Sequence, residues 1–151
     1  MKLKDYEYVL SKLDVPYMPL NFPYAYPIHK DADILCSKYH YSKVVDIISK
    51  YANKYAEKNG LSVRTVESDY RIKIRIEYAD FLIYQFDITY KNDEMGKDFI
   101  EQAVKRRKKK DDVFILCVED EIIIREYEYQ LYPYKEYHKD YIMEKRKNEC
   151  I

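Results

Sequence analysis

The stretch from residue 70 to residue 90, YRIKIRIEYADFLIYQFDITY, decides the fold of this chain. In its first half, isoleucines alternate with arginine, lysine and glutamate, which is the period-two pattern of a strand with one apolar and one charged face. Residues 81–90 repeat the alternation, and the segment 78–80 between the two halves has the length of a tight turn. The pattern predicts an antiparallel hairpin of strands 70–77 and 81–90.

The two faces of this hairpin predict its register. A turn centred on Ala79 places Arg71 opposite Asp87 and Lys73 opposite Gln85. All the isoleucines of the first strand then share a face with the apolar residues of the second, and a slip by one residue would destroy that agreement. We therefore expect the cations of the first strand to share the polar face with Asp87.

Upstream of the hairpin, residues 31–36 read as a strand and residues 42–58 as a helix with one broad apolar stripe. Asn59-Gly60 is a typical signal for the end of that helix. Residues 4–13 have the spacing of a short helix. Four prolines in residues 15–29 predict an irregular segment there.

Downstream, residues 97–109 read as a helix, followed by a short apolar strand over 113–118. Residues 119–131 and 134–147 predict two more helices, separated by Pro133. Helices and strands in this mixed order indicate an α+β fold with a small mixed, largely antiparallel sheet flanked by helices and a helical C-terminal tail. We expect a single domain over 1–151, with a core of about 20–118 and a tail of 119–147.

Charge and cysteine usage limit the partners. Acidic and basic residues number 27 each, whereas a general nucleic-acid binder has a basic excess, so net charge does not indicate nucleic acid. Cys36, Cys117 and Cys150 are far apart, which predicts no zinc site and a reducing compartment. The charged start MKLKDYEYVL and the lack of a long apolar run predict a cytoplasmic protein that does not enter membranes.

Two other features have alternative interpretations. The basic run 105–110 could contact nucleic-acid phosphates, but cations are also favoured at a helix C-terminus, and we prefer that interpretation. The chain has 19 tyrosines, which could stack bases or sugars, or could simply reflect genome composition. His29, His40 and His138 have no common ligand spacing and are predicted to lie at the surface.

Asp31-Ala32-Asp33 is the motif that carries chemistry. Because side chains alternate along a strand, both carboxylates lie on one face and repel each other unless a cation lies between them. Carboxylate oxygens suit magnesium, which also takes oxygens from phosphates. Asp87 is the natural third carboxylate, since an unpaired charge buried in its strand would be costly.

In this arrangement the chain resembles the nucleotidyltransferase superfamily, which includes DNA polymerase β. That family has a strand with Asp-x-Asp and an apolar residue, then a helix, then a later strand with a third acid. This chain has Asp31-Ala32-Asp33-Ile34-Leu35, the helix 42–58 and Phe86-Asp87-Ile88. The resemblance implies that Asp31, Asp33 and Asp87 are catalytic and bind magnesium, with two ions possible. It also suggests Lys135 and Asp140 of the tail as residues of the nucleotide site.

The chain departs from the family at the phosphate site. The family's Gly-Ser or Gly-Gly turn before Asp-x-Asp is replaced by the proline-containing segment 22–30, and the only glycines are Gly60 and Gly96. Lys30, Arg71 and Lys73 are the cations near the carboxylates that could bind phosphates instead.

Two functions remain open at this point. One is magnesium-dependent transfer of a nucleotidyl group from an NTP, such as ATP, to an unidentified acceptor. The other is a catalytically inactive module of the same fold that acts through protein–protein contacts. The sequence does not predict the oligomeric state.

Overall fold

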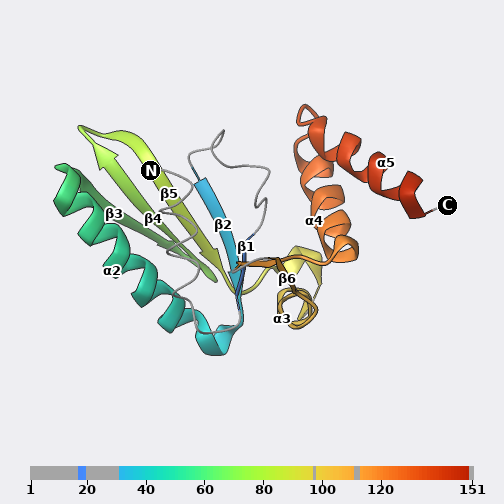
Figure 1. Ribbon diagram of the computed structural model, residues 1–151, viewed down its shortest axis with the longest axis horizontal. Helices are drawn as coiled ribbons and strands as arrows, with labels where there is room; N and C mark the ends of the chain where they lie inside the picture. Colours follow the sequence, from blue (N-terminus) through green and yellow to red (C-terminus); the bar gives the residue numbers. More distant parts are fainter. Residues whose placement is uncertain (1–16, 20–30, 97, 111–112, 150–151) are drawn as a thin grey trace.

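A five-stranded sheet lies at the centre of the protein, with strand order β1-β2-β5-β4-β3 (Figure 1). The structure is a computed structural model that describes residues 17–19, 31–96, 98–110 and 113–149; the predicted helix 4–13 and most of the segment 15–29 lie outside them. The strands are β1 (Tyr17–Pro19), β2 (Asp31–Cys36), β3 (Ser62–Ser68), β4 (Arg71–Tyr78) and β5 (Phe81–Thr89). Three pairings are antiparallel and one, β2 with β5, is parallel.

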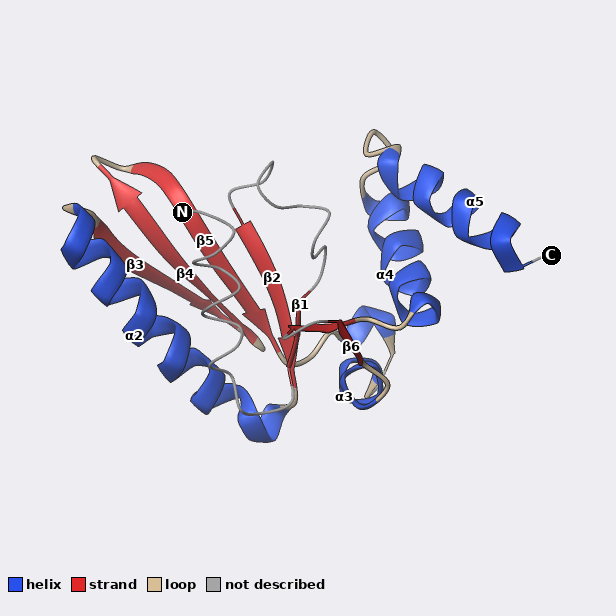
Figure 2. Ribbon diagram, viewed as in Figure 1, coloured by secondary structure: helices blue, strands red, loops and turns tan. Residues whose placement is uncertain are grey.

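Helices lie on both sides of this sheet (Figure 2). The chain adds η1 (Lys38–His40), α2 (Tyr41–Asn59), η2 (Asp93–Met95), α3 (Phe99–Lys105), α4 (Val118–Leu131) and α5 (Tyr137–Glu149), with a two-stranded sheet of β6 (Lys108–Lys110) and β7 (Val113–Ile115). The predicted α+β class and helical C-terminal tail are confirmed. In the described part of the chain, no helix has the length and apolar character needed to cross a membrane.

The hairpin forms as predicted, but its predicted register is wrong by two residues. Arg71 pairs with Thr89, and Lys73 rather than Arg71 lies opposite Asp87. The turn consists of two residues, Ala79 and Asp80, both with positive φ (46° and 67°), as in a type I′ hairpin. A register shift between Ile76 and Glu77 then adds one more residue. The total shift is even, so each side chain keeps the face that the alternation predicted.

Helix α2 packs on the apolar face of the sheet, as its broad apolar stripe predicts. Val44 and Ile48 of this helix are fully buried in one cluster with Ile74, Tyr84 and Phe86 of the hairpin. The helix ends at Gly60, whose φ of +66° is the left-handed conformation that glycine adopts at little cost. This packing leaves the opposite, polar face of the sheet for the functional site.

The second half of the chain differs more from prediction. Helix α3 ends at Lys105, Arg106 is its C-cap, and Arg107 Nη1 donates to the carbonyl oxygen of Val104 at 2.7 Å. Helix-end electrostatics therefore accounts for the first half of the basic run 105–110, whereas residues 108–110 lie in β6. The strand predicted over 113–118 is shorter, because Val118 already begins α4.

Strand β3 was not predicted from the sequence. Its residues are largely exposed, with only Val63 partly buried against the core. An edge strand of this kind lacks the apolar alternation on which sequence prediction depends. It forms because it pairs along its whole length with β4.

The core packing generates a stability prediction. Ile74 has no exposed surface, so Ile74→Ala should lower the free energy of unfolding by about 2–5 kcal/mol in a urea melt. Val66→Ala on exposed β3 is the control and should change it by less than about 0.5 kcal/mol. Equal effects of the two substitutions would contradict the assignment of the apolar face.

Candidate functional site

The parallel pairing of β2 with β5 brings two predicted site residues together. In this register Asp33 is the partner of Asp87, and Asp31 is the partner of Gln85. Neighbouring strands lie about 4.8 Å apart, so the side chains of a paired couple are neighbours on one face. Asp31 lies on that face as well, two residues before Asp33, which means that the structure gathers all three predicted carboxylates on the polar face of the sheet.

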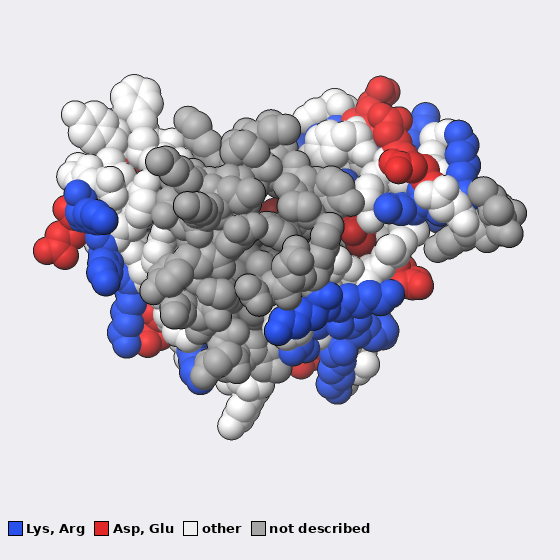
Figure 3. Space-filling view, viewed as in Figure 1, with Lys and Arg blue, Asp and Glu red and all other residues white. Residues whose placement is uncertain are grey.

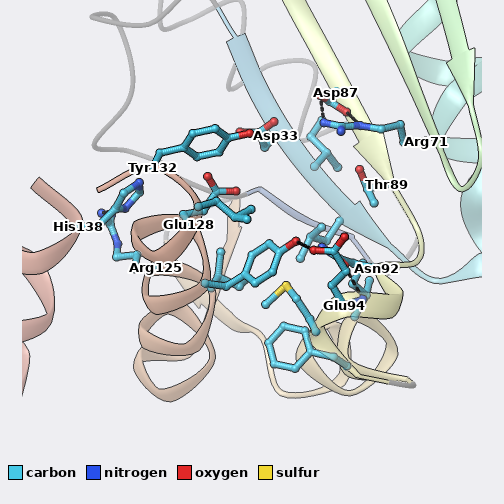
Figure 4. Close-up of a pocket in the computed structure, with 18 of the residues that line it drawn as sticks. Asp33, Arg71, Asp87, Thr89, Asn92, Glu94, Arg125, Glu128, Tyr132 and His138 are labelled. Carbon is cyan, nitrogen blue, oxygen red and sulfur yellow. Dashed lines mark hydrogen bonds and ion pairs between the residues drawn. The ribbon is translucent and has the colours of Figure 1, made fainter. Parts of the chain in front are cut away.

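This face forms one side of a large pocket. The other side comes from α4 and α5, and η2 with the start of α3 closes one end (Figure 4). Its volume is about 1270 Å³, larger than the roughly 300–1,000 Å³ usual for a small-molecule site. There is therefore room for a nucleotide and part of a second molecule.

Asp87 lies deep in this pocket. The sequence predicted that it would lie on an exposed face; it is on the predicted face, but the residue is only 4% exposed. Arg71 covers it, with Nε donating to Oδ1 at 3.0 Å and Nη2 donating to Oδ2. Arg71 pairs with Thr89, which lies two residues along β5 from Asp87, and its long side chain reaches Asp87 diagonally. This ion pair satisfies the buried charge that would otherwise be costly.

The charged form of Asp33 is disfavoured by its surroundings. Burial and the charges of Asp87, Asp31 and Glu128 raise the pKa of Asp33 from 3.8 to about 7, and Arg71 opposes this rise only in part. The desolvation effect is the largest cause, and the three neighbouring carboxylates add to it. Burial and the neighbouring carboxylates therefore favour a proton or a cation at Asp33.

The predicted cations have different positions. Lys73 lines the pocket on the same sheet face, directly opposite Asp87 in the register. Lys135 lines it from the tail side, with Nζ 4.8 Å from the ring centre of Tyr132, and Asp140 lines it as well. Lys30 and His29 lie outside the described residues. Arg71 is engaged with Asp87, so it is the least available of these cations for a phosphate.

A buried polar cluster, here called the tail network, holds α4 and α5 together beside the pocket. Arg125 donates through Nε and Nη2 to Oε1 of Glu121 at 3.1 and 2.9 Å, and its guanidinium lies 3.9 Å from the ring centre of Tyr141. Tyr141 donates to the other carboxylate oxygen of Glu121 at 2.6 Å. Arg125 Nη1 lies 3.4 Å from Nδ1 of His138. The network fixes the tail face that borders the pocket.

His138 was predicted to lie at the surface, and this is wrong, because only 4% of it is exposed. Burial and the nearby charges of Arg125 and Lys135 lower its pKa to about 4. The ring is therefore neutral at neutral pH. Arg125 only donates hydrogen bonds, so a neutral ring meets it with an unprotonated Nδ1 and carries its proton on Nε2.

Sequence reasoning missed the residues that the tail adds to the pocket. Glu128 raises the pKa of Asp33 from across the pocket, and Tyr132 lies on the same side (Figure 4). The one available signal was the spacing of Glu121, Arg125 and Glu128, which places three charged residues on one face of a helix. Charged faces usually meet solvent, so the spacing alone does not identify a pocket.

The donor set fits a divalent cation in its chemistry. Among the described residues, no three His, Cys, Asp or Glu side chains are already grouped so that they could hold a metal ion. Asp33 and Asp87 are nevertheless paired neighbours, and carboxylate oxygens are the preferred ligands of magnesium. The raised pKa of Asp33 has the same origin in part, and a cation beside Asp33 would relieve the repulsion from Asp87 and Asp31.

Comparison with known proteins leaves the family undefined. No protein family model matches the chain, and no curated protein matches it. Among solved structures, the chain matches the crystal structure of JHP933 from Helicobacter pylori with 16% sequence identity and a TM-score of 0.48. That similarity covers 81% of this chain and 53% of JHP933, so the chain spans about half the length of that protein.

The pKa of Asp33 generates a pH prediction for the metal-free protein. The pKa of Asp33 in the folded protein is about 7, above the ordinary value of 3.8. Protonated Asp33 therefore stabilises the folded state fully below about pH 4, and this stabilisation is lost as pH rises through 7. Asp33→Asn removes this dependence. Relative to the variant, the wild type should lose up to about 3 kcal/mol of unfolding free energy between about pH 5 and about pH 8.

Urea melts in EDTA at the two pH values measure this difference. Asp46→Asn, at an exposed position on α2, is the matched control and should follow the wild type. Parallel pH profiles for wild type and Asp33→Asn would mean that the Asp33 carboxyl is not electrostatically strained.

Proposed function

We propose that this protein is a magnesium-dependent nucleotidyltransferase that transfers a nucleotidyl group from an NTP to an acceptor hydroxyl. The observation that carries the proposal is the pairing of Asp33 with Asp87 on adjacent parallel strands, with Asp31 on the same face, inside a pocket of about 1270 Å³. This order of acidic residues along the chain is the one that resembles the nucleotidyltransferase superfamily.

Asp31, Asp33 and Asp87 would hold magnesium. The metal would supply charge neutralisation at the triphosphate and polarisation of the reacting phosphoryl group. Because Asp87 accepts two hydrogen bonds from Arg71, it would have to share its carboxylate between the guanidinium and a cation. Asp33 has the stronger electrostatic need for a cation, as its raised pKa indicates.

Lys73 and Lys135 are assigned to the phosphates. They approach the pocket from opposite sides, Lys73 from β4 and Lys135 from the connection between α4 and α5. Lysines act on phosphate as flexible point charges and can take the place of the backbone N–H groups of a glycine turn. Arg71 is assigned to position Asp87 and to add positive charge behind it.

The oxygen of the acceptor hydroxyl forms a bond to the α-phosphorus of the NTP, and the bond from that phosphorus to the bridging oxygen breaks. Pyrophosphate leaves with the electron pair of the broken bond. The carboxylate of Asp87 takes the hydroxyl proton.

A catalytically inactive binding module is the second candidate function, and one observation favours it. The Arg71–Asp87 ion pair satisfies a buried carboxylate without a metal ion. Tyr132, Tyr134 and Tyr137 are exposed around the connection between α4 and α5 and could contact a protein partner.

Calorimetric titration of magnesium with a non-hydrolysable ATP analogue separates the two functions. We expect a binding heat for the wild type and at least about a tenfold weaker affinity for Asp33→Asn, because the substitution removes a charged ligand. Asp46→Asn should bind like the wild type. Equal heats for wild type and Asp33→Asn, or no heat in either, would reject nucleotide transfer and favour the binding module.

A further inference from the structure

A concentrated basic surface lies at the end of α3 and on β6. We call Lys105, Arg106, Lys108 and Lys109 the basic patch; all four are exposed. In the space-filling view, lysine and arginine side chains gather over α3 and β6 (Figure 3). The chain as a whole carries no net charge, so this is a local concentration of charge that the total hides.

Internal ion pairs account for only part of this patch. Arg106 is engaged, since its Nε and Nη2 donate to the buried carboxylate of Asp120 at 3.0 and 2.7 Å. Lys108 is close enough to Glu119 to help lower the pKa of that carboxyl. Within the part of the chain that the structure describes, Lys105 and Lys109 have no ion-pair partner, which leaves their charge available to an external anion.

The patch is adjacent to the pocket along α3. This helix begins at Phe99, which lines the pocket, and ends at Lys105. Six residues at 1.5 Å per residue separate them by about 9 Å. That distance corresponds to about three phosphates of a stacked strand at roughly 3.4 Å each. Tyr132 lies beyond the far end of α4, twelve residues or about 18 Å from Asp120, which is bonded to Arg106 of the patch. A strand stacked at Tyr132 therefore reaches the patch after about five nucleotides.

Exposed aromatic side chains lie at the pocket. Tyr132 and Tyr137 line the pocket and are 41% and 49% exposed. Proteins that bind single-stranded nucleic acids combine basic surfaces for the backbone with aromatic rings on which bases stack. A small-molecule acceptor held at the tyrosines would not reach the lysines of the patch.

We propose that the acceptor is a polynucleotide strand whose terminal nucleotide enters the pocket between the sheet and the tail while its phosphates lie along the basic patch. The inference rests on the proposed function, because the hydroxyl of the terminal sugar is the attacking oxygen of the transfer. The patch supplies affinity for the backbone, and the pocket tyrosines stack the terminal bases.

Fluorescence anisotropy with a labelled single strand of about 12 nucleotides tests the patch, with RNA and DNA of the same sequence as separate arms. The buffer contains EDTA and no NTP, so that binding does not depend on the metal site. The patch variant is Lys105→Gln/Lys108→Gln/Lys109→Gln. The control is Lys50→Gln/Lys54→Gln/Lys58→Gln on exposed positions of α2, which changes the net charge equally.

We expect the wild type and the control to bind alike and the patch variant to bind at least about tenfold more weakly. The loss of three phosphate contacts should also make strand binding less dependent on salt. Between about 50 and 200 mM salt, the factor by which affinity falls should be about twentyfold smaller for the patch variant than for the wild type. Equal binding by patch variant and control, or no binding of either strand, would overturn the proposal and leave the lysines as protection of an edge strand.

A strand with a photoreactive base at its end tests the placement. Crosslinking of the end to Tyr132 or Tyr137 is expected, and crosslinking only outside the pocket would overturn it. Calorimetry with magnesium and the ATP analogue distinguishes failure of the proposed function. The patch variant should give the wild-type heat, because its lysines do not line the pocket. Strand binding without any nucleotide heat would reject transfer, and nucleotide heat without strand binding would reject only the polynucleotide acceptor.

Discussion

The parallel pairing of β2 with β5 is the constraint on which the rest of this structure depends. It joins β2 to the hairpin of β4 and β5, and its register sets Asp33 beside Asp87. The same pairing contributes Ile34 and Phe86 to the core under α2, on the other face of the sheet. One pairing thus buries apolar residues on one side and concentrates carboxylates on the other. A slip by one residue would exchange the two faces and lose both the core and the site.

The concentrated charge requires compensation, and the chain supplies it unequally. Asp87 has Arg71 as a partner with two hydrogen bonds, whereas Asp33 remains in an environment that raises its pKa to about 7. Glu128 of α4 adds negative charge from the opposite side of the pocket. An arrangement built only for stability would not gather like charges in this way, since repulsion and burial both oppose folding. The cost is understandable if the pocket binds a cation together with a phosphate ligand.

The sequence predicted the elements whose pattern is strong and missed those that depend on tertiary contacts. The hairpin, α2 and the Asp31 strand follow from apolar periodicity, and their predicted faces are correct. The exact register was beyond the sequence, because it depends on a two-residue turn at Ala79 and on a bulge beside Glu77. The burial of His138 among polar residues could not be predicted either, because the charged faces of the tail helices do not indicate which residues they pack against. Of the candidate site, the sequence predicted the carboxylates and the lining residues Arg71, Lys73, Lys135 and Asp140. The contribution of Glu128 emerged only from the packing of α4 opposite the sheet.

Crystals grown with manganese and a non-hydrolysable NTP analogue would show whether Asp33 and Asp87 form one cation site. Manganese accepts the same oxygen ligands as magnesium and scatters anomalously. We expect an anomalous peak bound by the carboxylates of Asp33 and Asp87, with the phosphates of the analogue on the side of Lys73. An intact Arg71–Asp87 ion pair with no manganese at Asp33 would contradict this expectation.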